Sequence, residues 1–347
     1  MKIEDRYRLE SKIGEGAQSV VFLGRCRQSG MAVAVKQIKP TIAPSLPRDK
    51  TIPISKLAAN YREVAILQRL RSTGMSHPNI VDLLEVVFDQ ECVYIVMDHC
   101  GMNLSEYIAR CRSSALDSLL GLSAKLSKLS APVVPIRTIQ DIFAQTLAAV
   151  AFVHSQLVIH RDLKPQNIFV GFLNERIVVK IGDFGLSKAL SFPITPETLN
   201  VASLWYRAPE VLLQSGYDVG IDLWSLGCIL AELAQGAPLF LESSEFGLLI
   251  KIFQTLGTPT KSCWRALSYS PNASRVWPKW NRHECLPRFT AFMQSLLGTS
   301  GCDLLLKLLT YESNERLRCR EALNHSFLRP SSEALHAHSD PLSSLNA

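Results

Sequence analysis

Residues 158–170 read VIHRDLKPQNIFV, a run that combines a carboxylate, an amine and an amide at short spacing. Asp162 could accept a hydroxyl proton, and Lys164 could neutralise a phosphoryl group during its transfer. Asn167 could hold a metal ion through its amide oxygen. A random loop rarely offers all three groups, so this stretch indicates chemistry on a phosphate.

A second stretch, KIGDFGLS at residues 180–187, follows closely. Asp183 supplies a hard oxygen ligand for a Mg²⁺ ion that bridges nucleotide phosphates. Asp-Phe-Gly by itself would occur by chance in about 5% of chains of this length. After HRDLKPQN, and in this order, a chance occurrence is negligible.

Upstream, residues 13–22 read IGEGAQSVVF, with Gly14 and Gly16 in a turn between two expected strands. Glycine lets backbone N–H groups approach a phosphate without a Cβ in the way, although such a turn taken alone is more often an ordinary hairpin. A dinucleotide-binding turn would open a helix, and a Walker loop would end in Lys-Ser or Lys-Thr. Neither feature is present here.

The next strand contains the run VAVK at residues 33–36. The ammonium of Lys36 could reach a phosphate held by the glycine turn. A single lysine on a strand is usually a solvated one. Glu63, on the helix that follows, could pair with Lys36 and fix its position.

Composition limits the class of protein. The chain has 347 residues, of which 47% are apolar and 20% charged, so two packed lobes are expected rather than a disordered chain. The 18 glycines and 18 prolines show no three-residue period, and no run of about 18 apolar residues occurs, which excludes collagen and transmembrane helices.

Charge and cysteine usage add further limits. The net charge of +6 is not gathered into a basic run, so neither a nucleic-acid nor a membrane partner is expected. The N-terminal MKIEDRYRLE alternates charges instead of forming an apolar signal core, which predicts a cytoplasmic or nuclear protein. The nine cysteines are odd in number and contain no C-x-x-C pair, which disfavours a disulfide framework and a zinc site.

Periodicity predicts three antiparallel strands over residues 7–39, a proline-rich loop over 40–53, a helix over 55–71 and two further strands over 80–100. The long periodic segments that follow are nearly all helical. The predicted fold class is therefore α+β. We expect a small five-stranded antiparallel sheet lobe with one main helix and a larger, mainly helical lobe.

The predicted domains are an N-terminal lobe at residues 1–98 and a C-terminal lobe at 99–328, followed by a disordered tail at 329–347. Residues 110–136 form a Ser- and Leu-rich insertion. Its composition favours a flexible surface loop, with a partner-docking helix as the alternative.

The motifs together resemble eukaryotic protein kinases from about residue 7 to residue 328. LWYRAPEVLL supplies the Ala-Pro-Glu of that family with Glu210, GIDLWSLGC supplies Asp222, and Arg316 is the arginine expected to pair with Glu210. LKPQN is similar to the serine/threonine kinases. LWYRAPE, LGTP and the helical insert behind it resemble the cyclin-dependent branch of the CMGC group.

The resemblance implies the bilobal protein kinase fold, with ATP and Mg²⁺ between the lobes. It implies that Asp162 is the base or orienter, Lys164 the phosphoryl clamp, Asn167 and Asp183 the metal ligands, and that His160 is structural. Lys36 and Glu63 would be the positioning pair. The implied ATP-binding residues are Ile13, Gly14, Glu15, Gly16, Ala17, Val20, Ala34, Lys36, the gatekeeper Met97, and the hinge residues Asp98 and Cys100.

Regulation is also implied. Thr198 stands where this branch is phosphorylated for activation, and the cations expected to receive the phosphate are Arg62, Arg161 and Lys188. The alternative is that Thr198 is an unmodified loop residue. Lys188 replaces an arginine and loses its bidentate geometry. The pocket for a proline after the target Ser or Thr would be formed by Val201, Ala202 and Arg207.

The sequence departs from the family at Ser19, which replaces the third glycine of the phosphate turn and is expected to weaken ATP binding. Ala17 and Gln18 replace an inhibitory Thr-Tyr pair found in cell-cycle members. The helix sequence LAANYRE leaves a cyclin or cyclin-like activator open. The predicted function is a serine/threonine kinase for protein sites before proline, and the alternative is a pseudokinase or scaffold.

Overall fold

The computed structural model describes residues 2–16, 19–38, 54–72, 76–88, 92–120, 131–189, 203–269 and 277–329. Several predicted features lie outside these residues. They are Ala17, Gln18, the proline-rich loop, Thr198, Val201, Ala202, residues 121–130 of the insertion and the tail from residue 330.

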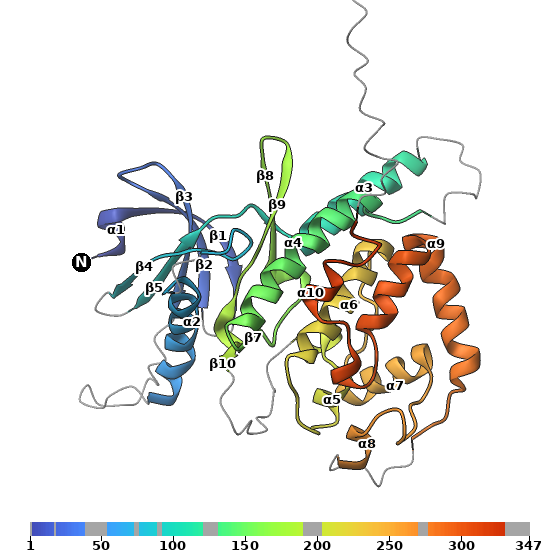
Figure 1. Ribbon diagram of the computed structural model, residues 1–347. Helices are drawn as coiled ribbons and strands as arrows, with labels where there is room; N and C mark the ends of the chain where they lie inside the picture. Colours follow the sequence, from blue (N-terminus) through green and yellow to red (C-terminus); the bar gives the residue numbers. More distant parts are fainter. Residues whose placement is uncertain are drawn as a thin grey trace, which may run out of the picture.

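The N-terminal lobe is built on the predicted five-stranded antiparallel sheet (Figure 1). Its strands are β1 (Tyr7–Glu15), β2 (Ser19–Cys26), β3 (Ala32–Ile38), β4 (Leu83–Phe88) and β5 (Val93–Asp98), in the order β1-β2-β3-β5-β4. The main helix, α2 (Ile54–Ser72), contributes Ile66, Leu67 and Leu70 to a core shared with the larger lobe.

The opposite face of the sheet carries a separate small core. Side chains alternate along a strand, so Val33 and Val35 of β3 both point to this face, where Tyr94 and Val96 of β5 join them. The short helix α1 (Ile3–Arg6) covers this core with Ile3.

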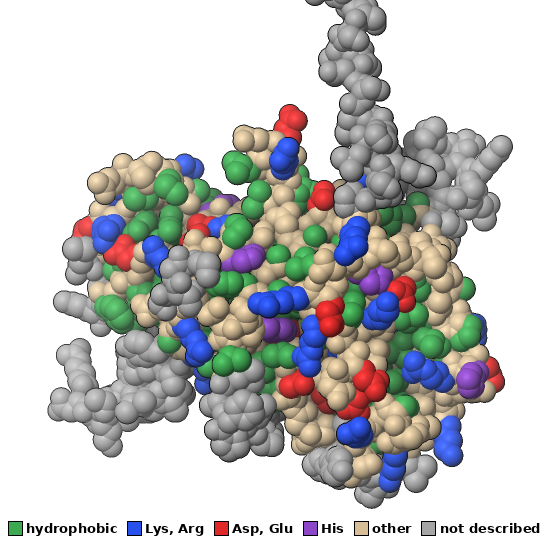
Figure 2. Space-filling view, in the orientation of Figure 1, with side chains coloured by type: hydrophobic (Ala, Val, Ile, Leu, Met, Phe, Trp, Pro, Cys, Tyr) green, Lys and Arg blue, Asp and Glu red, His purple; other side chains and the backbone are tan. Residues whose placement is uncertain are grey.

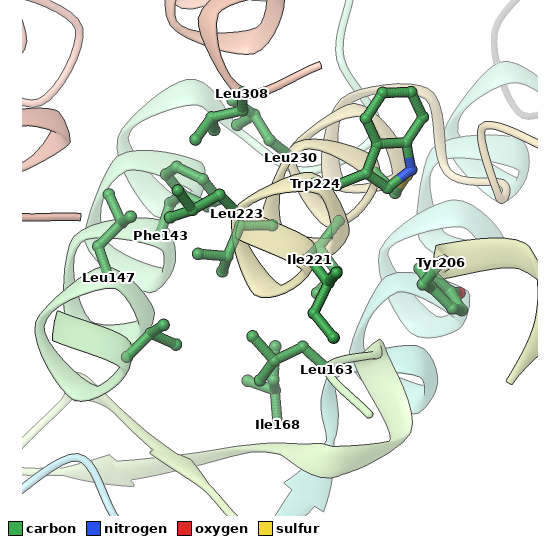
Figure 3. Packing of buried hydrophobic residues seen from close by; sticks show 14 of the residues in the cluster. Phe143, Leu147, Leu163, Ile168, Tyr206, Ile221, Leu223, Trp224, Leu230 and Leu308 are labelled. Carbon is green, nitrogen blue, oxygen red and sulfur yellow. The ribbon is translucent and has the colours of Figure 1, made fainter. Parts of the chain in front are cut away.

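The C-terminal lobe is mainly helical and surrounds α6 (Gly220–Gln235), which is buried along nearly its whole length. Figure 3 shows Leu223 of α6 beside Phe143 of α4, whereas Trp224 points away from α4 on the other side of α6. The longer helices are α3 (Leu104–Leu120), α4 (Ile136–Ser155), α7 (Glu245–Leu256) and α9 (Arg282–Leu308); the short ones are α5 (Pro209–Leu212), α8 (Ala266–Tyr269) and α10 (Cys319–Ala322).

Helix α4 is long and apolar enough to cross a membrane, judged by length and composition within the described part of the chain. Its buried residues, among them Phe143 and Leu147, pack into the core of the lobe. The same length and composition suit the core helix of a folded domain, and that is the position it holds here.

Five short strands were not predicted, and they hold the two motif stretches. β6 (Met102–Asn103), β8 (Ile168–Leu173) and β9 (Arg176–Ile181) form one sheet, and β7 (Val158–Ile159) pairs with β10 (Lys188–Ala189). Three of the five, β6, β7 and β10, have only two residues and leave almost no period in a sequence. β8 and β9 have six residues each, and their β-branched residues could have indicated strands.

Helix α3 differs from the prediction for the insertion. It continues to Leu120, so residues 113–120 are helical where a loop was favoured. The serines favoured a loop by composition, and the helix nevertheless extends through them.

Charged side chains are mixed on the surface. On the face of the molecule shown in Figure 2, the Lys and Arg side chains of the described residues are interspersed with Asp and Glu. This arrangement agrees with the absence of basic runs in the sequence.

Candidate active site

A cleft of about 850 Å³ lies between the two lobes and is lined by residues of both. It brings together most of the residues predicted to bind ATP, metal or phosphate. They are Ile13, Gly14, Glu15, Gly16, Ala34, Lys36, Glu63, Met97, Asp98, Cys100, Lys164, Asn167 and Asp183.

One predicted cleft residue is corrected. Val21 lines the cleft and Val20 does not. Successive side chains of a strand point to opposite faces, so the two valines cannot share one environment. Val21 is the register partner of Lys36, another lining residue, which fixes the cleft-facing phase of β2.

Lys36 forms the centre of the upper half of the site. Its Nζ lies 2.6 Å from Glu63 Oε2 and 3.1 Å from Asp183 Oδ1, so the predicted pair with Glu63 is present. Burial lowers the pKa of Lys36, but the Glu63 and Asp183 carboxylates together outweigh burial and the pKa is raised. Lys36 therefore stays a cation at neutral pH.

The two carboxylates respond in opposite directions. Burial raises the pKa of Glu63, and the Lys36 ammonium only partly counters this effect. Burial would also raise the pKa of Asp183, but Lys36 outweighs it and the pKa is lowered. Asp183 is thus held ionised at the place where a metal ligand was predicted.

The backbone around Asp183 is tightly constrained. Asp183 is in the left-handed region at φ 59°. A Cβ on the preceding Gly182 would lie 2.9 Å from the ring of Phe169 and 3.0 Å from a methyl of Val81, so only glycine fits. Phe184 is completely buried, with its ring centroid 4.9 Å from that of His160.

The lower half of the site is centred on Asp162, which is 7% exposed. Lys164 Nζ lies 2.7 Å from Asp162 Oδ2, and Asn167 Nδ2 donates to the same oxygen at 3.1 Å. Ser203 joins this network twice. Its backbone N–H donates to Asp162 Oδ1 at 3.2 Å, and its hydroxyl accepts from Lys164 at 2.9 Å.

A buried scaffold supports Asp162. Asp222 is 1% exposed and accepts the backbone N–H groups of His160 at 2.9 Å and Arg161 at 3.0 Å. Burial would raise the pKa of Asp222, but the interactions with His154 and His160 together outweigh it and the pKa is lowered. His160 is fully buried, and its Nε2 lies 3.0 Å from Gly182 O, in agreement with the structural role predicted for it.

The residues predicted to bind a metal fit a magnesium ion by their donor chemistry. Asn167 donates through Nδ2, and Asp183 engages Lys36 through Oδ1, which leaves Asn167 Oδ1 and Asp183 Oδ2 as ligands. Among the described residues no group of three or more His, Cys, Asp or Glu could hold a metal ion. Two oxygen ligands completed by phosphates and water are typical of Mg²⁺.

The structure describes only some of the residues predicted to have a regulatory or substrate-binding role. Arg161 has a φ of 68°, and its Nη1 donates to Tyr217 Oη at 2.9 Å. Arg62 lies on α2 and Lys188 on β10. Arg207 pairs with Glu245 at the start of α7. Because Thr198, Val201 and Ala202 lie outside the described residues, their predicted contacts stay predictions.

Sequence reasoning missed several residues that line the cleft, among them Val21, Phe169 and Ser203. The alternation of β2, counted from Lys36 across the sheet, could have identified Val21. A hydroxyl residue just before LWYRAPE was the available signal for Ser203. Phe169, which lines the cleft, had none beyond its place after Asn167.

Comparison with known families gives one finding. A family model described as the protein kinase domain matches residues 7–328. This span contains both lobes and every residue of the site described above.

Proposed function

This chain belongs to the protein kinase family, and we propose that it is a serine/threonine kinase that transfers the γ-phosphoryl group of Mg·ATP to protein sites followed by proline. Membership of the family implies an enzyme that uses ATP and a divalent metal. The observation that carries the proposal is the contact of Asp162 with Lys164 and Ser203, two residues that line the same cleft as Lys36 and Asp183.

The chemistry follows from these positions. An acceptor hydroxyl beside Asp162 attacks the γ-phosphorus, the bond to the ADP oxygen breaks, and Asp162 takes the hydroxyl proton. Lys164, already 2.7 Å from Asp162, neutralises the phosphoryl oxygens as they move between donor and acceptor. Lys36 orients the other phosphates with its remaining N–H. Mg²⁺, when bound by Asn167 and Asp183, supplies neutralisation of the phosphate charge.

Serine/threonine and proline preference are supported by the LKPQN stretch and by Arg207. The ion pair with Glu245 fixes the Arg207 side chain, which is only 10% exposed. A fixed cation near the acceptor site suits a pocket for proline, because proline has no backbone N–H for the cation to repel.

The test uses a set of matched peptides and Mg·ATP. Wild-type protein is expected to phosphorylate a Ser-Pro peptide and its Thr-Pro form. We expect little phosphorylation of the Ser-Ala and Tyr-Pro forms. The variant Asp162→Asn should act on the order of 10²- to 10⁴-fold more slowly, because it lacks the proton acceptor.

Each outcome is informative. Equal rates for wild type and Asp162→Asn would refute catalysis by this site. Phosphorylation of the Ser-Ala peptide at the Ser-Pro rate would remove proline preference alone. No phosphorylation by either protein, even with candidate cyclins added, would favour the pseudokinase or scaffold. Ser19 in place of the third glycine is the feature of the sequence that supports this alternative.

Activation at Thr198 and by a cyclin-like partner is part of the proposal. Arg62, Arg161 and Lys188 are the cations expected to receive a phosphate on Thr198. Mass spectrometry of active protein should find phosphate on Thr198, and Thr198→Ala should lower activity. Full activity of Thr198→Ala would contradict this mode of activation. A pull-down would identify the partner.

A further inference from the structure

Three charged side chains that belong to no common motif meet at the hinge. Lys180 Nζ lies 2.7 Å from Asp98 Oδ2 and 3.1 Å from Asp82 Oδ2. Asp98 ends β5, Asp82 directly precedes β4, and Lys180 lies on β9, which leads into Asp183. One ammonium therefore connects the sheet of the N-terminal lobe, the hinge and the strand before the metal ligand.

The Asp98 carboxylate is the centre of this arrangement. Its Oδ1 accepts the backbone N–H of Asp82 at 2.7 Å, and its Oδ2 accepts the Cys100 thiol at 3.3 Å as well as Lys180. Burial, reinforced by Asp98, raises the pKa of Cys100, so the thiol keeps the proton that it donates. Donors from three segments thus fix the hinge backbone from residue 98 to residue 100.

The hinge faces the cleft, but the cation does not. Asp98 and Cys100 line the cleft, whereas Lys180 is not among its lining residues. Lys180 can therefore influence a bound nucleotide only through the hinge or through β9.

Backbone bonds hold β9 in place without the ion pair. Val81 N donates to Ile181 O at 3.0 Å, and Ile181 N donates to Asn79 O at 2.9 Å. Loss of the Lys180 charge should therefore leave Asp183 where it is. No backbone hydrogen bond of this kind joins the hinge to Lys180 among the described residues.

We propose that Lys180 is a positioning residue that sets the hinge for the base of the nucleotide by neutralising Asp82 and Asp98. Without it, the two carboxylates that share this cation would repel each other and push the hinge away from β4. The inference rests on the proposed function, because it takes the hinge as the nucleotide-binding segment.

The test measures the dissociation constant of a fluorescent ATP analogue, together with kcat and KM for ATP. Lys180→Met is expected to raise the dissociation constant and KM on the order of tenfold, within the range found for coupling between separate sites. The value of kcat should stay within about twofold, since no transition-state contact is lost. Lys180→Arg keeps the charge and should keep the affinity.

A matched control removes the same kind of group, a lysine ammonium, from an exposed ion pair. Lys307 Nζ lies 2.7 Å from Asp303 Oδ2, and both side chains are about half exposed. Lys307→Met should leave nucleotide affinity unchanged. Thermal unfolding of each variant checks that the fold is retained.

A double variant tests the electrostatic cause. Asp82→Asn in the Lys180→Met background removes one of the two facing charges and should restore the affinity to within about twofold of wild type. About 1 M salt should also reduce the defect of Lys180→Met, because Asp82 is 43% exposed and open to screening.

Three results would overturn the inference while the proposed function stands. They are unchanged affinity in Lys180→Met, a fall in kcat without a change in affinity, and a double variant no better than Lys180→Met. Absence of nucleotide binding by wild-type protein would overturn the proposed function together with the inference.

Discussion

Two buried ion pairs, one in each lobe, differ in how completely their polar atoms are hydrogen-bonded. In the C-terminal lobe, Arg316 binds Glu210 through both terminal nitrogens, at 2.6 and 2.8 Å. Its other N–H groups donate to the carbonyl oxygens of Thr310 at 2.8 Å, Gly220 at 2.8 Å and Tyr311 at 3.1 Å. All five N–H groups of the guanidinium therefore have an acceptor.

The pair in the cleft is not saturated. Lys36 has three N–H groups and two acceptors, Glu63 and Asp183. The second oxygen of Glu63, Oε1, is buried without a hydrogen-bond partner among the described residues. The Arg316 pair therefore stabilises its lobe through a complete set of hydrogen bonds. The Lys36 pair keeps hydrogen-bonding capacity for a ligand and gains less from folding alone.

The largest effect should come from breaking the saturated pair. Glu210→Ala leaves a buried guanidinium without its carboxylate and should lower the free energy of unfolding by about 3–5 kcal/mol. Urea unfolding measures the loss. The double variant Glu210→Leu with Arg316→Met removes both charges and should recover most of it. A loss under about 1 kcal/mol in Glu210→Ala would remove the contrast between the two pairs.

For the Lys36–Glu63 pair in the cleft we expect the opposite: a large effect on activity and a small effect on stability. Lys36→Met should lower the rate of phosphoryl transfer on the order of 10²- to 10³-fold, the usual cost of one electrostatic contact to the reacting group. Near pH 5 its free energy of unfolding should change by less than about 1 kcal/mol, because Glu63 can protonate. Peptide phosphorylation and urea unfolding, with Lys307→Met as control, measure both. A large stability loss with full activity would reverse the comparison.

Much of the site could be predicted because its residues lie in short contiguous motifs. Asp162, Lys164 and Asn167 fall within six residues, so local spacing was enough. The pairing of Arg316 with Glu210, 106 positions apart, was predicted only through the family resemblance. The hinge network of Asp98 and Lys180 has neither a motif nor a period, and only the folded chain reveals it.

The fold was predicted where strands and helices are long. The five strands of the sheet are β-branched runs bounded by turns, and α2 carries apolar residues at helical spacing from Leu57 to Leu70. The error of one residue at Val20 arose because adjacent valines carry no information about which one faces the cleft. Strands β7 and β10 are too short for any period and form only because the lobe brings residues 158–159 and 188–189 together.

A pH titration sharpens the contrast through Glu63. A carboxyl group whose folded pKa is raised contributes its stability below its unfolded pKa, and the contribution is lost as pH rises through the folded value. Burial raises the pKa of Glu63 against the pull of Lys36, so Lys36→Met must raise it further. The stability deficit of Lys36→Met should therefore grow by roughly 1–2 kcal/mol from about pH 5 to pH 8, at about 1.4 kcal/mol per pKa unit.

The control for this titration removes the titrating group. In Lys36→Met with Glu63→Gln, the Glu63 position can no longer ionise and Asp183 is the carboxyl of this contact that is left. The part of the change between the two pH values that comes from Glu63 should therefore disappear. Urea unfolding at each pH gives both numbers. A deficit that shrinks as pH rises would contradict the assignment to Glu63.

The smallest effect is expected at Glu232, a buried carboxyl whose Oε2 accepts one uncharged donor, Tyr206 Oη, at 2.7 Å. Burial raises the pKa of Glu232, and the Tyr206 hydrogen bond only partly offsets it. Its contribution to stability is thus full below the unfolded pKa and declines as pH rises. Glu232→Gln keeps an acceptor but cannot ionise, so relative to wild type it should gain up to about 1 kcal/mol between about pH 5 and pH 8. Melting temperatures at both pH values measure this gain. A relative loss as pH rises would mean that the Tyr206 hydrogen bond holds the Glu232 carboxylate ionised, and that hydrogen bonding rather than burial decides the charge of this carboxyl.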